Sequence, residues 1–388
     1  MQSSIKAVQI SHKKHVEHLS GEPTPLAMDL TYAHDFEKNS YRIIELGSED
    51  LVSAFQSGSG VVIKGQPDDE AVLCTATKTF SIHQVNTSNS ILLATGGNNM
   101  IHVVDDVSST IELLPCVARL GTIDTLLEPT MYAGSRNESN LSDKKFYSYD
   151  NLLSLVQASE AELTVGLKAR NAFVIDGKCR LLERTYLNRL LDILFTNATI
   201  NGFDIGSISL ENAKKCIREG LDIDESIAEP ALTAFIQSFV SNTEDISSLS
   251  FDEHKVCRFI GEVILSSTVG KEWALDDFLD IWKQLTPEGF NPDIMTLEGL
   301  YLPLERVTLP PKRIQKYVAY FPVSELSTDP AQRFATLFRR KKLWGSDEIT
   351  PFLSDIASDS KKRDALLLKY ARAQKSDGGK ILYGSRIK

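Results

Sequence analysis

The spacing of hydrophobic and polar positions changes part-way along the chain. Over residues 41–104, short β-type runs (YRIIEL, GVVIKG, EAVLCT, KTFSIHQV and SILLAT) alternate with clusters of Gly, Asp, Asn and Ser, and GGNNMIHVVDD and STIELLP predict further strands. Short strands separated by turn residues are typical of an antiparallel sheet or barrel. We therefore expect a variable lead-in over residues 1–40 and a β-rich, barrel-type domain over residues 41–130.

Helical periodicity dominates the rest of the chain. YDNLLSLVQ and AELTVGLKARNAF each place apolar side chains on one face, which predicts two helices, the second capped by Ser159. An Asp176-Gly177 pair between two apolar runs predicts a hairpin. Helix, turn, helix and hairpin is the order of a winged helix-turn-helix unit. After a linker over residues 131–145, we expect a first winged-helix-like domain with extra helices over residues 146–248.

The same order of elements returns twice. DEHKVCRFIGEVIL, TVGKEWALDDFLDIWKQL and MTLEGLYL predict three helices, and ERVTLPPKRIQKYVAYFP predicts a β-wing. DPAQRFATLFRRKKLW, DEITPFLSDIA and KKRDALLLKYARAQ predict three more helices, followed by GGKILYGSR as a wing. We expect a second winged-helix domain over residues 249–326 and a third over residues 327–388. The predicted fold class is α+β, with an N-terminal antiparallel β-barrel-type domain followed by tandem winged-helix domains.

The composition adds to this picture by excluding classes of protein, such as membrane-spanning and secreted ones. Of 388 residues, 42% are hydrophobic and 24% are charged, as in an ordinary soluble protein. We find no apolar run close to the roughly 18 residues that a bilayer-spanning helix needs, and the N-terminus lacks the apolar core of a secretory signal. Five scattered cysteines, none in a CxxC pair, predict reduced thiols in a cytosolic or nuclear protein.

No motif in the chain predicts catalysis. GSGVVIKG lacks the spacing of a P-loop, TGGNNM lacks that of a dinucleotide fingerprint, and GxSxG and HExxH are absent. His12, His15 and His18 are the best metal candidate, but a helix would bring at most two of them together, so a solvated tail is favoured. We expect no catalytic residue, cofactor, metal site, small-molecule substrate or membrane association.

Charge is distributed unevenly along a chain whose net charge is −10. Residues 219–254 hold nine acidic residues and no Lys or Arg, whereas residues 361–388 hold nine basic residues against two acidic ones. We interpret the acidic stretch as a solvated linker face, with a basic protein partner as the alternative. The RRKK run at residues 339–342 is interpreted as a solvated helix end, with a nuclear-import signal as the alternative.

The C-terminal basic cluster is the candidate nucleic-acid surface. On a helix predicted over residues 361–374, an apolar face packs inward while Lys362, Lys369 and Arg372 point outward. Few neighbouring side chains suit base recognition, so we expect contacts mainly with phosphates, and a merely solvated surface is the alternative. The candidate residues are Lys361, Lys362, Arg363, Lys369, Arg372, Lys375, Lys380 and Arg386.

Five stretches of the chain resemble a known family. They are KTFSIHQVNTSNSILL, YSYDNLLSLVQASEAEL, WKQLTPEGF, QRFATLFRRKKLW and LLLKYARAQKSDGGKILYGSR. In this order, from about residue 41 to the end, the chain resembles the Dcc-one sister-chromatid-cohesion proteins. These are accessory subunits of the CTF-eighteen alternative clamp loader, a replication factor C-like complex.

The resemblance implies partners and a location. The N-terminal region would join a β-barrel assembly with the small barrel subunit and the C-terminal tail of the clamp loader's large subunit. The winged helices would contact single- or double-stranded DNA. The complex would act on PCNA, associate with DNA polymerase epsilon, and support sister chromatid cohesion and DNA replication in the nucleus.

A barrel shared among chains needs open strand edges, so residues 41–130 are expected to behave poorly in isolation. The candidate partner-binding residues are Val61, Val62, Ile63, Phe80, Ile82, Ile91, Leu92 and Leu93.

Two other interpretations remain open. A winged-helix scaffold of a degradation or transcription complex would bind only proteins, and salt-dependent DNA affinity lost on neutralising Lys369, Arg372 and Lys380 would argue against it. An enzyme with an unrecognised site is the third possibility. Alanine substitutions at His83 and His102 that left every function intact would count against it.

Overall fold

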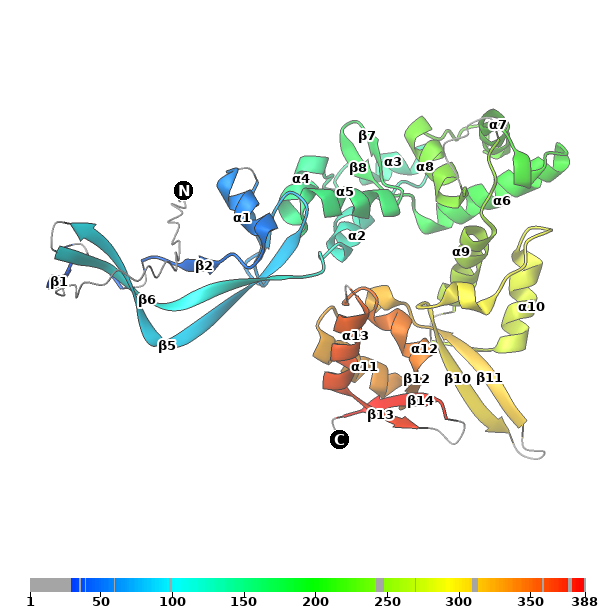
Figure 1. Cartoon of the computed structure of the whole chain (residues 1–388). Helices are drawn as coiled ribbons and strands as arrows, with labels where there is room; N and C mark the ends of the chain where they lie inside the picture. The colour runs from blue at the N-terminus through cyan, green and yellow to red at the C-terminus, as the bar shows by residue number, and fades with distance from the viewer. Residues whose placement is uncertain are drawn as a thin grey trace. The chain divides into compact units, whose positions relative to one another are not determined.

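The computed structural model shows an α+β chain that divides into two compact units (Figure 1). Unit 1 contains Met1–Glu45 and Gln84–Glu112, and unit 2 contains Leu46–His83 and Leu113–Lys388. The structure describes residues 29–34, 36–38, 40–58, 60–97, 100–241, 248–268, 270–308, 313–357, 359–375 and 379–386.

The strands of unit 1 form a mixed sheet. β1 (Asp29–Tyr32) and β2 (Ile43–Glu45) both pair in parallel with β6 (Met100–Pro115). The fully buried Asp105 carboxylate accepts a 2.7 Å hydrogen bond from the backbone N–H of Tyr41 and so ties the incoming chain to β6. β5 (Thr79–Gly97) and β6 are long strands that each contribute residues to both units.

The remaining strands of the same sheet belong to unit 2. β3 (Val62–Lys64), β4 (Val72–Cys74) and the first residues of β5 pair antiparallel, and the hydrogen-bonded order of the sheet is β1-β6-β5-β4-β3, with β2 also on β6. α1 (Glu49–Gln56) precedes β3; the Ser48 side chain accepts the Leu51 N–H at its N-terminus. None of the described sheets closes into a barrel, so the barrel remains a prediction about an assembly.

The sheet corrects the sequence analysis in two respects. The antiparallel prediction holds for β3, β4 and β5 but is wrong for β2, because its partner lies more than 60 residues away and turn residues carry no information about it. β1, which also pairs in parallel with β6, lies in the lead-in, where no strand was predicted. KTFSIHQV and SILLAT were expected as separate strands but are both part of β5. Ser88, Asn89 and Ser90 between them are exposed, so their polarity reflects contact with water and not a turn.

From residue 146 the first helical region follows the predicted order of helix, helix and hairpin, whereas the two helices within residues 121–138 that precede it were not predicted. The helices are α2 (Gly121–Leu127), α3 (Ser135–Glu138), α4 (Tyr149–Leu155), α5 (Glu160–Ala169), α6 (Arg184–Ile200), α7 (Leu210–Gly220) and α8 (Glu229–Phe239). The predicted cap at Ser159 is confirmed as a capping box with Glu162. The predicted hairpin is confirmed as β7 (Phe173–Ile175) and β8 (Lys178–Arg180). Positive φ angles of 49° at Asp176 and 73° at Gly177 give the two-residue turn that such hairpins favour.

The second region contains α9 (Glu253–Ser266), β9 (Glu272–Ala274), α10 (Leu275–Leu285), β10 (Tyr301–Thr308) and β11 (Arg313–Tyr320), with strand order β10-β11-β9. The helix expected in MTLEGLYL is only the short 3₁₀ turn η4 (Ile294–Leu297). Gly299, at a φ of 79°, and Pro303 prevent a longer helix there.

The third region contains α11 (Pro330–Arg340), β12 (Leu343–Gly345), α12 (Ser346–Ile349), α13 (Ser360–Tyr370), β13 (Ala371–Lys375) and β14 (Ile381–Ser385), with strand order β12-β14-β13. The helix predicted over residues 361–374 ends at Tyr370, because the following residues pair with β14. Tertiary pairing overrides the local helical preference there. The winged-helix assignment of these regions remains a prediction.

A buried polar junction fastens the β3-β4-β5 end of the sheet to the start of α5 within unit 2. Lys64 is 8% exposed and its Nζ donates a 2.6 Å hydrogen bond to the carbonyl oxygen of Ala158. Thr79 donates through its hydroxyl to Glu162 at 2.5 Å and accepts the Ser159 N–H at 3.0 Å. Burial lowers the pKa of Lys64, and nearby acidic groups partly offset that effect.

The substitution Glu162→Ala is expected to destabilise this junction by about 2–4 kcal/mol. About 1 kcal/mol comes from the lost capping box and about 1–3 kcal/mol from the buried Thr79 hydroxyl that loses its acceptor. Hydrogen exchange of the β4 and α5 amides would measure the loss. Glu160→Ala, an exposed residue of the same first turn, is the control and should change exchange little. Equal protection in both variants would contradict the prediction.

Candidate nucleic-acid interface

α13 is held in the third region by one apolar face. The Asp359 side chain caps its N-terminus by accepting the Lys362 N–H at 2.8 Å. Leu367 is buried, Leu366 packs against the same core, and the Tyr370 ring stacks on Phe334 of α11 with 5.3 Å between centroids. The predicted inward face is therefore confirmed.

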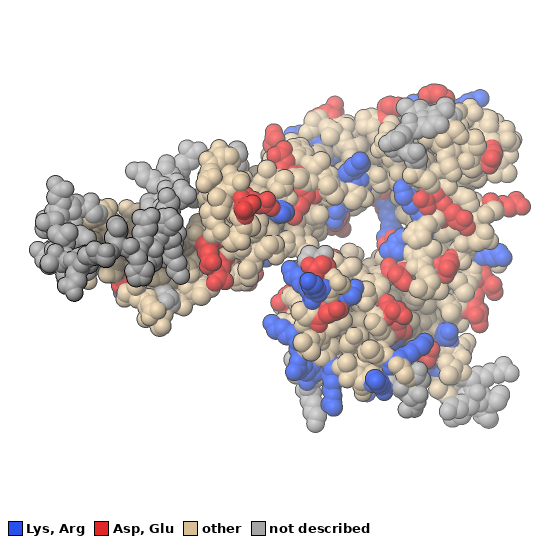
Figure 2. Space-filling view, in the orientation of Figure 1, with Lys and Arg blue, Asp and Glu red and all other residues tan. Residues whose placement is uncertain are grey.

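The opposite surface is cationic. Lys361 and Lys369 on α13, Arg372 and Lys375 on β13, and Lys380 before β14 are all exposed. β13 pairs with β14 along its whole length, so these side chains lie on one helix and the hairpin that follows it directly. Figure 2 shows Lys and Arg gathered over the third region of the chain. Whether this surface binds nucleic acid remains a prediction.

Three of the candidate cations are less available to an anion: Arg386 and Arg363 have partners within the protein, and Lys362 is only half-exposed. Arg386 Nη1 donates a 2.5 Å hydrogen bond to the carbonyl oxygen of Leu368, so it caps the C-terminal end of α13. Lys362 and Arg363 are only half-exposed, and Arg363 Nε lies 3.5 Å from an Asp364 carboxylate oxygen. We therefore expect Arg386 to stabilise the helix and the other exposed cations to dominate any contact with an anion.

The structure adds cations that the sequence analysis set aside. Arg339 and Arg340 form the last turn of α11, as the helix-end interpretation of the RRKK run predicted. Lys342 is exposed and directly precedes β12, whose Leu343 pairs with Gly384 of β14. Gly384 also pairs with Arg372, so the RRKK run and the terminal cluster meet at one three-stranded sheet. The RRKK run was visible in the sequence, but the strand order that brings it to the terminal cluster could not be predicted from the sequence.

The candidate partner-binding residues of the β-rich region are placed unequally. Val62 and Ile63, 49% and 54% exposed, lie on β3, the last strand in the sheet order, so no described strand pairs with its outer edge. Leu92 on β5 is 42% exposed. Phe80 is buried at 2% exposure and supports the sheet from inside. The remaining four, half-exposed, are Val61, Ile82, Ile91 and Leu93.

The acidic stretch of residues 219–254 is not a linker in its described part. α8 lies within it and buries Leu232, Phe235 and Phe239 in the core. The Glu229 carboxylate is bound by Lys214 and Arg218, and these cations hold the pKa of that carboxyl below its usual range. Most of the described acidic side chains therefore have partners within the chain or cap a helix.

The described residues contain no group of three or more His, Cys, Asp or Glu side chains that could hold a metal ion. The candidate trio His12, His15 and His18 lies outside the described residues. His83 and His102 each hydrogen-bond a hydroxyl group, of Ser81 and Thr31 respectively. No helix in the described part of the chain is both long and apolar enough to cross a bilayer.

Burial raises the pKa of every cysteine thiol, which disfavours the thiolate that a nucleophile needs. The five residues are Cys74, Cys116, Cys179, Cys216 and Cys257, the last with a pKa of about 11.

Comparison with known proteins decides the family. The model of the family described as Sister chromatid cohesion protein Dcc1 matches residues 41–353. This chain belongs to the Dcc1 family. The resemblance inferred from the sequence is thereby confirmed.

Relatives named Sister chromatid cohesion protein DCC1 share low but extended identity with the chain. The Xenopus tropicalis protein is 29% identical over 372 residues, covering 92% of each chain. The Homo sapiens protein is 28% identical over 353 residues, covering 87% of this chain and 86% of its own length. The Saccharomyces cerevisiae protein is 29% identical over 226 residues, 55% of each chain. The alignments with the animal Dcc1 proteins therefore extend over both units of the fold.

Proposed function

We propose that this chain is a non-enzymatic subunit of an alternative, replication factor C-like clamp loader that acts on PCNA in the nucleus. In that role it supports sister chromatid cohesion and DNA replication and links the clamp loader to DNA polymerase epsilon. The proposal is carried by the match to relatives named for sister chromatid cohesion, which covers 92% of this chain. The burial of four of the five thiols and the lack of a catalytic motif agree with an accessory role.

We further propose that residues 146–248, 249–326 and 327–388 are tandem winged-helix domains. The third region runs helix, strand, helix, helix, strand, strand, and its three strands form one sheet in the order β12-β14-β13. The second region has the same order with η4 in place of the third helix. In the first, α4 and α5 precede the β7–β8 hairpin, and the extra helices α6, α7 and α8 follow it. These element orders support the winged-helix assignment.

DNA contact is proposed for the third of these domains. In a winged helix the third helix and the wing face the nucleic acid, and here those positions are taken by α13 and the β13–β14 hairpin with their exposed cations. In the second domain a single 3₁₀ turn stands at the position of that helix, which favours the third domain as the contact. The phosphates of single- or double-stranded DNA would be the groups bound.

The β-rich region is proposed to join the small barrel subunit and the C-terminal tail of the clamp loader's large subunit. The outer edge of β3, with which no described strand pairs, and its exposed Val62 and Ile63 support strand pairing or packing against another chain there. We retain a linker over residues 131–145 and a lead-in over residues 1–40 as proposed boundaries, although α3 lies in the first segment and β1 in the second.

Co-expression of the chain with these two partners tests the proposal. We expect a one-to-one-to-one complex by size-exclusion chromatography with light scattering, and its loss in the variant Val62→Asp/Ile63→Asp. The matched control, Val174→Asp/Ile200→Asp, alters residues of β7 and α6 that are 52% and 75% exposed and should retain the complex. A chain that stays monomeric beside both partners would exclude the clamp-loader role and leave a winged-helix scaffold.

A further inference from the structure

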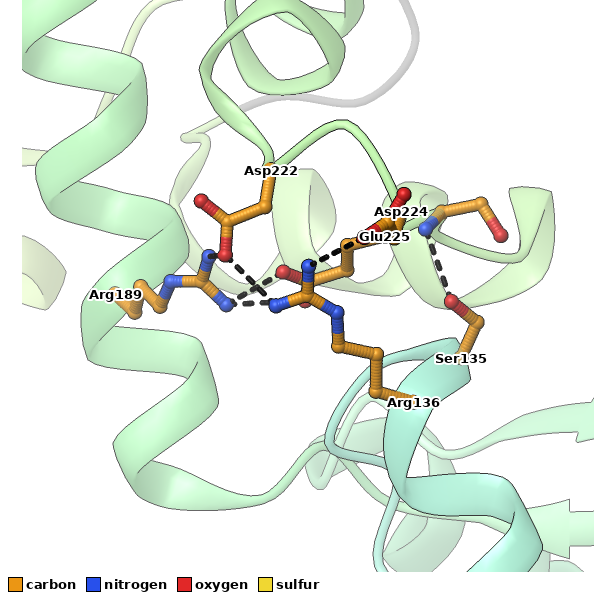
Figure 3. Close-up of polar contacts among 7 residues, drawn as sticks. Ser135, Arg136, Arg189, Asp222, Asp224 and Glu225 are labelled. Carbon is orange, nitrogen blue, oxygen red and sulfur yellow. Dashed lines mark hydrogen bonds and ion pairs between the residues drawn. The ribbon is translucent and has the colours of Figure 1, made fainter.

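A short acidic loop between α7 and α8, residues 221–228, lies on two arginines from distant parts of the chain. Figure 3 shows the guanidinium groups of Arg136 on α3 and Arg189 on α6 pointing toward each other, with the loop's acidic residues around them. Arg136 Nη1 and Arg189 Nη2 both bind the same Asp222 oxygen, at 2.9 Å and 3.3 Å. We call four residues the arginine socket: Arg136 and Arg189, which bind the acidic side chains, and Ser135 and Tyr132, which bind the loop's backbone.

The loop's backbone is bound as well as its side chains. The Ser226 N–H donates to the Ser135 hydroxyl oxygen at 2.9 Å, and the Ser135 N–H donates to the Ser226 carbonyl oxygen at 3.2 Å. The Ala228 N–H donates to the Tyr132 hydroxyl at 2.9 Å. The socket therefore binds both the charge and the main chain of a peptide segment.

Glu225 inserts most deeply. Its side chain is 3% exposed and accepts two hydrogen bonds from Arg189 Nη1, at 2.7 Å and 3.0 Å. Gly134, at a φ of 89°, leaves room for it, because a Cβ atom there would lie 2.7 Å from the Glu225 carboxylate. Burial, reinforced by the Glu225 charge, raises the pKa of Tyr186 beside it. The socket is thus shaped to receive one carboxylate in its interior.

The other contacts lie near water. The side chains of Asp222 and Asp224 are 59% and 87% exposed, and those of Arg136 and Arg189 are 49% and 41% exposed. Exposed ion pairs contribute little net free energy, so the Asp222 and Asp224 contacts hold the loop only weakly. The buried Glu225 carboxylate and the packing of Leu221, Ile227 and Ala228 on the core hold it more strongly, so the loop detaches only if another carboxylate replaces that of Glu225.

We propose that the arginine socket is a binding site for an acidic peptide of a partner protein, and that loop 221–228 occupies it in cis. The observed loop is itself an acidic peptide, which is why we infer this class of ligand. Arginine pairs recognise acidic motifs by charge-assisted bonds, and the Ser135 and Tyr132 contacts add the main-chain bonds that a bound peptide requires.

The cis loop makes binding conditional. The tethered loop competes with a partner's peptide for the socket at an effective concentration in the millimolar range. It therefore excludes peptides that bind weakly, and only peptides that bind tightly displace it. A permanent structural ion-pair network is the competing explanation, and in that case no peptide exchanges with the loop.

Fluorescence anisotropy with the full chain tests the exchange. The probe is a fluorescein-labelled peptide with the sequence of residues 221–228, LDIDESIA. We expect the variant Asp222→Asn/Glu225→Gln, which weakens the cis contact, to bind the probe at least about tenfold more tightly than the unaltered chain. Adding Arg136→Gln/Arg189→Gln should abolish that binding. The neutral peptide LNINQSIA should bind none of the variants.

Equal affinity of the unaltered chain and the first variant, or affinity that survives loss of both arginines, would overturn the proposal. A measurement on the unaltered chain covers the case in which the variant fails to fold. Excess LDIDESIA should speed hydrogen exchange of the Ser226 and Ala228 amides, because the cis loop is displaced. Unchanged exchange at peptide concentrations up to several millimolar would show a permanent network.

Discussion

Reversing three charges on the third region, Lys369→Glu, Arg372→Glu and Lys380→Glu, is expected to weaken DNA binding by on the order of 100-fold at about 0.15 M salt. These side chains lie on α13, on β13 and immediately before β14, and all three are exposed. If each contacts one phosphate, the slope of log affinity against log salt concentration should fall by about 3. Fluorescence anisotropy with labelled single-stranded and duplex oligonucleotides over a salt series measures both quantities.

The control for this experiment carries the same change in net charge elsewhere. Lys168→Glu, Lys178→Glu and Lys283→Glu alter exposed lysines of α5, β8 and α10. We expect this variant to keep most of the affinity and the salt slope. Equal losses in the two variants would indicate a general effect of net charge, and unchanged affinity in the first would refute the proposed interface.

Asp355→Asn is expected to destabilise the third region by about 3–5 kcal/mol. Arg333 on α11 is fully buried, and Asp355 is its counterion, with Nη2 and Oδ2 2.7 Å apart. Its guanidinium also donates to the carbonyl oxygens of Ser327, Phe352 and Leu326. The asparagine keeps the shape of the aspartate but removes its charge, so a buried cation loses its compensation. The Asp355 side chain is 39% exposed, and because water around it screens the charges, we expect a loss of stability near the lower end of that range, about 3 kcal/mol.

Hydrogen exchange of the α11 and α13 amides is the appropriate measurement, because the thermal or denaturant unfolding of a multidomain chain does not give the stability of one region. Asp364→Asn is the matched control: its 69% exposed carboxylate pairs with Arg363 at 3.5 Å and should contribute less than about 1 kcal/mol. Protection of α11 that is the same in both variants would contradict the prediction. If α11 does lose protection in Asp355→Asn, any loss of DNA binding in that variant follows from unfolding of the third region and not from a lost contact with DNA.

Local signals in the sequence were sufficient for most helices and for the hairpin. The serine at position 159 marked the start of α5, and Asp176-Gly177 marked the β7–β8 turn, because capping and positive φ angles depend on a few neighbouring residues. The core face of α13 was predictable for the same reason, since helical periodicity is a local property.

Features set by distant contacts were not predictable. The parallel pairing of β1 and β2 with β6 joins segments more than 60 residues apart. The extent of β5 through exposed polar residues depends on its neighbours in the sheet, and the end of α13 at Tyr370 depends on β14. The joining of the RRKK run to the terminal basic cluster in one sheet and the binding of loop 221–228 by Arg136 also arise from the tertiary fold. The sequence shows that these basic and acidic residues are present, but it does not show which of them lie next to one another.

The junction between the sheet and α5 has a consequence for synthesis of the chain. Lys64 and Ala158 are 94 residues apart, and Thr79 and Glu162 are 83 residues apart. At translation rates of about 5–20 residues per second, β3 waits roughly 5–20 s for its partner on α5 to be synthesised. During that interval Lys64 cannot reach its carbonyl partner, and Val62 and Ile63 are available to any other strand. The nascent chain is therefore expected to need a chaperone, or an early-arriving subunit, while it is still attached to the ribosome.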